Sequence, residues 1–270
     1  MTTPESNYPD SYYLHSANSN KQRPQLTESI DADVCVIGGG YTGLLAALNL
    51  AEKNYRVVLL EANKIGWGAS GRNGGQVGSG HNKKIDQLEK DYGKSLAREL
   101  WDLSEHAKKI VKDRIIDHQI NCDLTHGNMA VSNNPKDDGD HRHYVDKLNK
   151  DYDYNLIRYV EQEEVYDIFH SPFFKGGGSM DMGGMHLHPL NYALGLADAA
   201  EHQGVEIYEN SKVLNYSKGS TSQVTTEHGT VNAKIVVLAC NAYLEKLEKR
   251  IAGKIIPINN FILATEPLEE

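Results

Sequence analysis

The feature that most constrains the fold is a short apolar run that opens directly into glycines. Residues 34–37, Val-Cys-Val-Ile, have the length and the β-branched content of a buried parallel strand. The run Gly38-Gly39-Gly40-Tyr41-Thr42-Gly43 follows at once and forms a G-x-G-x-x-G pattern. In such a pattern the first glycine permits a tight turn, the second lets backbone N–H groups approach a diphosphate, and the third lets a helix pack closely on the sheet.

The residues that follow complete a strand–helix–strand unit. Residues 44–51 place leucine and alanine on one helical face, and Asn54 stands where the helix should end. Residues 56–60 then predict a second apolar strand, which ends at Glu61. A carboxylate at this position accepts hydrogen bonds from ribose hydroxyls, so the unit predicts a bound dinucleotide. The alternative is that Glu61 is only a solvated charge at the end of a strand.

A second glycine-rich run, residues 66–76 (GWGASGRNGGQ), is too rich in glycine to fold on its own side chains. Ser70, Arg72, Asn73 and Gln76 supply hydrogen-bond donors for a phosphate or for the polar edge of an isoalloxazine ring. Because a long cofactor would give this loop a purpose, the two runs together favour a flavin over a nicotinamide. The alternative is a mobile surface loop.

Composition argues against several classes of function. The 270 residues are 39% hydrophobic, and the net charge of -9 comes without a dense Lys/Arg block, so we expect neither nucleic acid nor an anionic membrane as a partner. No run of about 18 apolar residues predicts a membrane span. The three cysteines, Cys35, Cys122 and Cys240, lack metal-ligand spacing and favour the reducing cytoplasm.

Two His-x-His pairs, His141/His143 and His186/His188, also lack a third ligand at metal-binding spacing. We therefore expect no metal. A place for His186 or His188 near a flavin or its substrate is the alternative.

The rest of the chain predicts an interrupted α/β domain. A long helix over residues 83–116 should cover the sheet through the apolar positions Leu88, Leu96, Leu100, Leu103, Ala107, Ile110 and Val111. Residues 120–175 predict short strands with a loop over 133–140, which we interpret as an insertion. A helix starting at Pro189 and ending before Gly204 then precedes strands over 205–208, 212–215, 223–226 and 231–240, the last with an inner-strand pattern.

At these residues the chain resembles the FAD-dependent oxidoreductases of the D-amino-acid oxidase (DAO) type, and within them the gamma-glutamylputrescine oxidoreductases and related amine oxidases. The most specific match is the run 66–76. Further matches are SYYLHSAN at 11–18, HLHPLNYALGLADAAEHQGVEIYENSKV at 186–213, VVLACNAY at 236–243 and IPINNFILATEPL at 256–268. One departure is Cys240, where a glycine is expected.

The resemblance implies FAD, with its AMP half on the first glycine run and Glu61, its diphosphate and flavin near residues 70–76, and its adenine against the backbone at Val213. The cofactor-binding residues it implies are Gly38, Gly40, Tyr41, Thr42, Gly43, Glu61, Ala62, Ala69, Ser70, Arg72, Asn73, Gly74, Gln76, Val213 and Ala239. Arg72 is expected to be either a cation beside the flavin or a phosphate ligand. No catalytic acid or base is assigned.

The fold implied is α/β (α+β overall), with a doubly wound, Rossmann-like FAD-binding domain and an inserted, incomplete substrate domain. The expected limits are 1–118 and 182–252 for the FAD-binding domain, 119–181 for the insertion, and 253–270 for the start of the main substrate-domain sheet. A strand over 260–265 should begin that sheet.

The activity implied is oxidation of the C–H bond next to an amine nitrogen to an imine, with oxygen or another acceptor reoxidising the flavin. The substrate implied is a small amine, such as gamma-glutamylputrescine in polyamine catabolism, or an amino acid. Family members are longer, so we expect an N-terminal portion, with a second polypeptide as a candidate source of the rest. A non-catalytic FAD-binding fragment and an NAD-dependent dehydrogenase are the alternatives.

Overall fold

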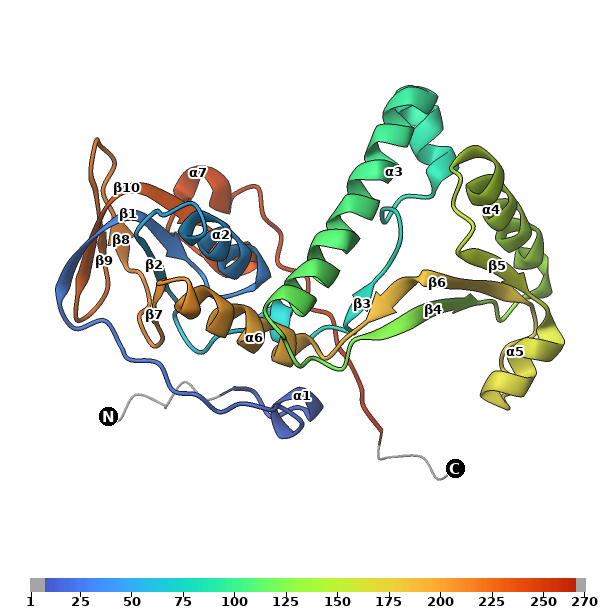
Figure 1. Ribbon diagram of the computed structural model, residues 1–270, viewed down its shortest axis with the longest axis horizontal. Helices are drawn as coiled ribbons and strands as arrows, with labels where there is room; N and C mark the ends of the chain where they lie inside the picture. Colours follow the sequence, from blue (N-terminus) through green and yellow to red (C-terminus); the bar gives the residue numbers. More distant parts are fainter. Residues whose placement is uncertain (1–7, 266–270) are drawn as a thin grey trace. The chain divides into compact units, whose positions relative to one another are not determined.

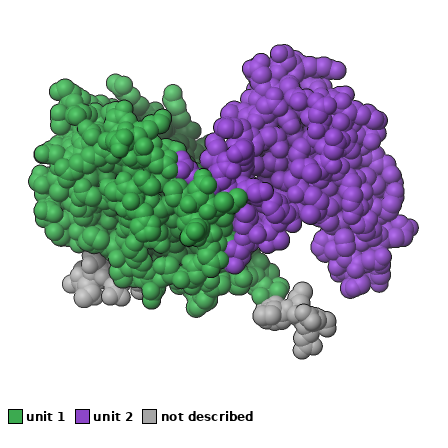
Figure 2. Space-filling view, in the orientation of Figure 1, with its two compact units in different colours: residues 1–74, 115–122, 188–270 green, residues 75–114, 123–187 purple. Residues whose placement is uncertain are grey.

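The computed structural model describes residues 8–265. The chain forms two compact units, shown in different colours in Figure 2. Unit 1 comprises residues 1–74, 115–122 and 188–270, and unit 2 comprises residues 75–114 and 123–187. The predicted domain limits remain a prediction; they differ from these units mainly because they assign residues 75–114 to the FAD-binding domain. Residues 266–268 of the C-terminal match lie outside the described residues.

Unit 1 is built on a six-stranded sheet with the order β7-β2-β1-β10-β9-β8 (Figure 1). Its strands are β1 (Ser29–Ile37), β2 (Val57–Leu60), β7 (Glu206–Tyr208), β8 (Asn215–Tyr216), β9 (Ser222–Thr225) and β10 (Thr230–Leu238). The first four in that order are parallel, and β9 and β8 add an antiparallel edge. β1 is central and its last four residues, 34–37, are fully or nearly buried, as expected of an inner parallel strand. The predicted α/β class is confirmed.

The helices of unit 1 are α1 (Tyr12–His15), α2 (Tyr41–Ala51), α6 (Pro189–His202) and α7 (Lys249–Ala252), with short 3₁₀ helices at Ala69–Gly71 and Asn241–Leu244. α2 buries the predicted face, Leu44, Leu48 and Ala51, and packs against α6 and β2. Asn54 follows α2 with φ of 65°, the left-handed conformation that commonly ends a helix. The strand–helix–strand unit predicted from the first glycine run is therefore confirmed.

Unit 2 contains an antiparallel sheet in which β6 (Gly178–His186) pairs with β3 (Gln76–Val77), β4 (Thr125–Val131) and β5 (Ile157–Val160). Its helices are α3 (Ile85–Asp117, whose last three residues belong to unit 1), α4 (Asp138–Asp151) and α5 (Gln162–Phe169), with a 3₁₀ helix at Pro135–Asp137. α3 is kinked at Gly93, where φ is 81° and ψ is 160° (Figure 1). The core of the unit joins α3 and α4 around Trp101 and Leu148.

The long helix predicted over 83–116 is confirmed as α3, but only part of the predicted packing is right, since Leu88 is buried in the core of unit 2 and Leu100 packs against that core. The positions expected to face a sheet include four that are exposed: Leu96, Leu103, Ala107 and Ile110. α3 instead buries Ala97 and Trp101, because the Trp101 ring packs edge-on against the rings of Tyr152 and Tyr154 at 5.6 and 5.2 Å.

Three other local predictions are wrong. Residues 133–140 are not only a loop, because α4 begins at Asp138, and the strand expected over 212–215 forms only as β8 at 215–216. The strand expected over 260–265 does not form: these residues have no regular secondary structure, and Phe261 and Leu263 are 91% and 89% exposed. A strand requires the hydrogen bonds of a neighbouring strand, and none of the described residues offers one there.

Within residues 8–265, no helix has both the length and the apolar character needed to cross a membrane. In the same part of the chain, no group of three or more His, Cys, Asp or Glu side chains is placed to share a metal ion.

Candidate functional site

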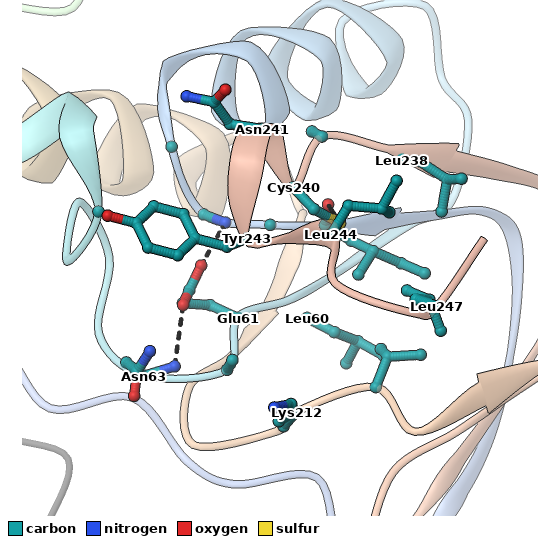
Figure 3. A pocket seen from close by; sticks show the side chains of 18 of the residues that line it. Leu60, Glu61, Asn63, Lys212, Leu238, Cys240, Asn241, Tyr243, Leu244 and Leu247 are labelled. Carbon is teal, nitrogen blue, oxygen red and sulfur yellow. Dashed lines mark hydrogen bonds between the residues drawn. The ribbon is translucent and has the colours of Figure 1, made fainter. Parts of the chain in front are cut away.

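A cavity of about 810 Å³ opens at the carboxyl ends of β1, β2 and β10, and all the residues that line it belong to unit 1 (Figure 3). The start of α2, the turn after β2 and residues 67–70 form part of its wall, and residues 212–214 and 238–247 form the rest. Ligands of parallel α/β sheets bind in the crevice outside the carboxyl ends of the strands. The cavity has the position and the size of a small-molecule site.

The first glycine run is glycine-rich because backbone atoms crowd it. Gly38 has φ of 113°, and a Cβ there would lie 2.5 Å from the carbonyl oxygen of Ala239. A Cβ at Gly43 would overlap the carbonyl oxygen of Gly38. The absence of both side chains lets α2 start directly above β1 and brings its N-terminus to the cavity.

The N-terminus of α2 is held by the second glycine run. The Tyr41 amide donates a hydrogen bond to Ser70 Oγ at 3.0 Å, and a Cβ at Gly40 would lie 2.8 Å from the same oxygen. Helix N-termini carry unpaired amides and a partial positive charge, so they bind anions well. Because Gly40, Tyr41, Thr42 and Ser70 all line the cavity, this end of it can accommodate a diphosphate.

Glu61, at the end of β2, faces the same cavity (Figure 3). Its carboxylate accepts hydrogen bonds from the Gly39 amide at 2.6 Å and from the Asn63 amide at 2.9 Å. Burial raises the pKa of the Glu61 carboxyl above its usual range, while hydrogen bonds from backbone amides oppose that rise. A carboxylate fixed in this way can still accept hydrogen bonds from a ribose, because each oxygen has two lone pairs.

Part of the cavity wall is apolar. Leu60, Leu238, Leu244 and Leu247 contribute side chains to it (Figure 3), and Val213 and Leu214 also line it. At one side of this wall the Lys212 ammonium pairs with the Glu245 carboxylate at 3.1 Å. An apolar wall beside a carboxylate suits a purine attached to a ribose.

The second glycine run packs against α6 and against itself. A Cβ at Gly66 would lie 3.0 Å from the Ala193 side chain and 3.1 Å from that of Leu190, and a Cβ at Gly71 would overlap the Gly66 carbonyl oxygen. Asn73 closes the turn, because its side-chain amide donates to the carbonyls of Ala69 and Ser70, both at 3.0 Å. The loop does not depend on its own side chains alone, because α6 packs against Gly66 and Gly71; a contact with a cofactor remains a prediction.

Arg72 contacts two neighbouring aromatic side chains, Trp67 and Tyr243. Its guanidinium lies 5.1 Å from the centre of the Trp67 ring and donates long hydrogen bonds, both 3.5 Å, to the Gly68 carbonyl and to the Tyr243 hydroxyl. Trp67 and Tyr243 pack edge-on at 5.8 Å and line the cavity, whereas Arg72 does not. Neither aromatic residue was predicted as a site residue, although Trp67 lies in the second glycine run and Tyr243 ends the match at 236–243.

The structure brings most of the predicted cofactor-binding residues to one cavity. Those that line it are Gly38, Gly40, Tyr41, Thr42, Glu61, Ala62, Ala69, Ser70, Val213 and Ala239. Those that do not line it are Gly43, Arg72, Asn73, Gly74 and Gln76. Gly43 serves packing instead, and Gln76 belongs to unit 2, where it pairs with His186.

The histidine pairs have other contacts. His188 is buried as the N-cap of α6: its Nδ1 accepts from the Asn191 amide at 3.1 Å, and its Nε2 lies 3.0 Å from Ser16 Oγ. His186 is exposed on β6. His143 lies 3.1 Å from Asp86, and His141 Nδ1 lies 3.4 Å from Ser179 Oγ. Neither His186 nor His188 lines the cavity.

The parallel sheet, the glycine turn and the carboxylate after β2 define a dinucleotide-binding protein. Residues 33–270 match the DAO family, described as FAD dependent oxidoreductase, and the chain belongs to that family. The resemblance inferred from the sequence is thereby confirmed.

Curated relatives extend the comparison. The chain is 40% identical over 268 residues to gamma-glutamylputrescine oxidoreductase of Escherichia coli (strain K12), a match that covers 96% of this chain and 61% of the relative. It is 39% identical over 265 residues to the probable oxidoreductase OrdL of Haemophilus influenzae, with 96% and 61% covered. The chain thus spans about three fifths of the length of these relatives.

Solved structures share the fold at low sequence identity. Glycine oxidase from Geobacillus kaustophilus aligns with a TM-score of 0.64 and 20% identity, covering 82% of this chain and 58% of that one. A deletion form of L-amino acid deaminase from Proteus vulgaris aligns with a TM-score of 0.67 and 19% identity, covering 92% and 62%. These likenesses establish the FAD-binding fold.

FAD is the cofactor of this family, so the prediction of a flavin is confirmed. The residues of the cavity fit that group by their chemistry. The amides at the start of α2 suit its diphosphate, Glu61 suits its ribose, and the apolar wall of residues 213–214 and 238–247 suits its adenine.

Proposed function

We propose that this chain forms the FAD-binding part of an oxidoreductase that converts the C–H bond next to an amine nitrogen to an imine. The proposed substrate is gamma-glutamylputrescine or a similar small amine or amino acid, which would place the protein in polyamine catabolism. The observation that carries this proposal is the 40% identity over 268 residues with gamma-glutamylputrescine oxidoreductase. The cavity of unit 1 supports it, because its donors suit FAD.

The proposed contacts divide FAD among three groups of residues. Its AMP half would lie on residues 38–43, Glu61, Ala62 and Val213, close to Ala239. Its diphosphate would lie at the amides of Tyr41 and Thr42 and at Ser70, with Ala69 beside it. The flavin would lie toward residues 72–76, which include Arg72, Asn73, Gly74 and Gln76. Support is strongest for the first two groups, because all of those residues except Gly43 line one cavity.

When bound, FAD would supply the redox chemistry by accepting two electrons from the substrate, with oxygen or another acceptor taking them afterwards. This chain's own residues would bind FAD and orient it. The α2 amides would offset the negative charge of the diphosphate. The Tyr41 amide already donates to Ser70 Oγ, so a diphosphate oxygen would compete with Ser70 Oγ for that amide. Glu61 would accept from the ribose while its bonds to the Gly39 and Asn63 amides keep it in place.

Turnover of the amine is proposed to require sequence equivalent to the rest of the relatives' length, because this chain spans about three fifths of it. A second polypeptide is one proposed source. Cys35, Cys122 and Cys240 form no disulfide bond within the described residues, which supports the cytoplasm as the proposed location.

The test begins with the purified chain. It should be yellow, or become so with added FAD, and Glu61→Gln should weaken FAD binding in a fluorescence titration. Glu227→Gln, an exposed carboxylate of unit 1, is the matched control and should leave FAD affinity unchanged. A colourless chain that FAD does not reconstitute would reject the proposal, and tight NADH binding in its place would favour the dehydrogenase alternative.

The second step is anaerobic addition of gamma-glutamylputrescine. Bleaching of the flavin bands by the chain alone supports a complete amine site. Bleaching only after addition of a polypeptide equivalent to the remaining part of the E. coli relative supports the two-part arrangement. Retention of FAD without bleaching under either condition would reject amine oxidation and leave an FAD-binding fragment.

A further inference from the structure

Helix α3 of unit 2 carries an apolar stripe of which the core of that unit contacts only Leu100. The α3 stripe consists of Leu96, Leu100, Leu103, Ala107 and Ile110. Leu103 is 59% exposed, Leu96 43% and Ile110 39%, whereas Leu100 is half-buried. The face that α3 does bury, Ala97, Trp101, Ser104 and Lys108, lies one residue further along, about 100° around the helix.

The spacing within the α3 stripe indicates a helical partner. Its five members are separated by four, three, four and three residues, the a/d alternation of a coiled coil. Leu96, Leu103 and Ile110 then occupy d positions, and Leu100 and Ala107 occupy a positions. Exposed apolar side chains are common singly, but a continuous row of them marks an interaction site.

Two polar side chains beside the stripe indicate which partner fits. Glu99 and His106 occupy successive g positions, both are exposed, and neither has a hydrogen-bond or ion-pair partner within residues 8–265. Neighbouring charges on α3 do pair within the helix, as Arg98 with Asp102 at 3.2 Å. An unpaired carboxylate and an unpaired imidazole one heptad apart are complementary to each other on a reversed copy of the same helix.

We propose that two copies of this chain associate through an antiparallel pairing of their α3 stripes. In antiparallel coiled coils an a residue faces a d residue, and g faces g. Leu100 then faces Leu103 of the second copy, and Leu96 faces Ala107. Glu99 faces His106 of the second copy, and the two-fold axis repeats each of these contacts.

The kink of α3 extends the fit by one more layer. Ile110 follows Ala107 along the second copy, so beyond the pair of Leu96 and Ala107 it would lie near the kink at Gly93, where a Cβ would meet no atom within 4 Å. A groove of about 360 Å³ lies there, lined by Leu88, Tyr92, Leu96 and Leu100 together with residues 81–83. The isoleucine would fill this groove, and the short contact predicts a dimer with a dissociation constant in the micromolar range.

Sedimentation of the whole 270-residue chain, with FAD present, tests the proposal. The mass should rise with concentration from monomer to dimer, and Leu103→Glu should weaken the dimer about tenfold or more, because it places two carboxylates in the seam. Leu156→Glu, at an equally exposed leucine of unit 2 outside the stripe, is the matched control and should leave the dimer unchanged.

Charge exchange tests the orientation. Glu99→Lys alone and His106→Glu alone should each weaken the dimer, and the double variant should restore it, because each new lysine then faces a new glutamate. Cysteines at the two positions add a direct test: chains carrying Glu99→Cys and His106→Cys should form a mixed disulfide when combined and little when kept apart.

A chain that is monomeric at all accessible concentrations overturns the proposal. So does a dimer that Leu103→Glu leaves intact. If Leu103→Glu lowers the thermal unfolding temperature of a monomer without changing its mass, the stripe packs within its own chain, and the second copy is excluded as the partner.

Discussion

In the first glycine-rich run, residues 38–43, the missing side chains of Gly38 and Gly43 make room for the backbone of Ala239 and of Gly38 itself. In the second, residues 66–76, the missing side chains of Gly66 and Gly71 make room for side chains of α6 and for the backbone of the loop. Gly43 lies against the carbonyl of Gly38, and Gly71 lies against the carbonyl of Gly66 and the side chain of Leu190. Both runs resemble ligand loops in sequence. In both, packing within unit 1 explains a large part of the glycine content.

The difference lies in what each run presents to the cavity. The first presents the start of a helix, with its amides and its dipole, and the second presents a hydroxyl, Ser70 Oγ, that already accepts from one of those amides. The first run is therefore predicted to control whether α2 and β1 assemble. The second is predicted to control how the helix N-terminus is shared between Ser70 and a diphosphate.

The largest effect is expected for Gly43→Ala. Its Cβ would overlap the carbonyl oxygen of Gly38, a turn residue that directly follows the central strand β1 and is held there by the hydrogen bond from its amide to the Leu60 carbonyl at 2.9 Å. We expect a loss of about 3 kcal/mol or more in the free energy of unfolding, measured by urea denaturation, with FAD binding lost as a consequence. Gly219→Ala is the control, because its Cβ would meet only the Thr221 carbonyl oxygen at 3.6 Å. Equal stability of the two variants would remove the packing explanation for the first run.

A smaller effect is expected for Gly71→Ala. The added Cβ would overlap the Gly66 carbonyl oxygen, but this clash lies in a loop whose backbone can shift more readily than the turn held at the end of β1. We expect a loss of about 2 kcal/mol in the free energy of unfolding, and FAD affinity that falls further than stability alone explains. The comparison of the two runs fails if Gly71→Ala destabilises as much as Gly43→Ala.

Gly40→Ala should act on affinity more than on folding. Its Cβ would lie 2.8 Å from Ser70 Oγ, the end of a side chain that can rotate away, so the variant loses little more than the hydrogen bond to the Tyr41 amide. We expect a cost of about 1 kcal/mol in the free energy of unfolding and a measurable rise in the FAD dissociation constant.

The double variant Gly40→Ala/Ser70→Gly separates two causes of that weaker binding. If FAD affinity recovers, the single variant failed because it displaced Ser70 into the cavity. If affinity stays low, the alanine itself obstructs the cofactor. Unchanged affinity in Gly40→Ala would mean that the diphosphate does not approach this turn.

The sequence predicted the elements whose patterns are local. The apolar strand, the glycine turn, the face of α2 and Glu61 at the end of β2 follow from residue spacing alone, and the structure places Glu61 at the cavity. The residues that spacing could not supply are those brought in from distant segments. Trp67 and Tyr243 meet across more than 170 positions, and Arg72 is engaged by both of them.

The packing of helix α3 also depends on residues that are distant in the sequence. Its two neighbouring stripes are both partly apolar, and the sequence favoured the one at Leu96 and Leu103. The structure buries the other, because Trp101 finds two tyrosine rings to pack against. The strand expected over 260–265 failed for a related reason: a strand depends on a neighbour that no local pattern can specify.

The smallest effect concerns the thiol of Cys240, which lines the cavity next to the first glycine run. Burial, with a further contribution from the nearby Glu61 carboxylate, raises the pKa of Cys240 to about 11. Only the thiolate reacts with iodoacetamide, so alkylation at neutral pH should be slow and should accelerate about tenfold per pH unit until the pH approaches that pKa. Peptide mass spectrometry measures the rate, and bound FAD should lower it by covering the cavity wall.

Cys35 serves as the internal control for this measurement. It is fully buried on β1, and burial raises its pKa to about 12, so it should react more slowly still and show no dependence on FAD. Protection of Cys240 alone would link the cofactor to the first run and its neighbours at the ends of β1 and β10. Equal rates with and without FAD would indicate that the cofactor lies away from this side of the cavity, toward the second run. The assignment of the cofactor to the first run would then be wrong.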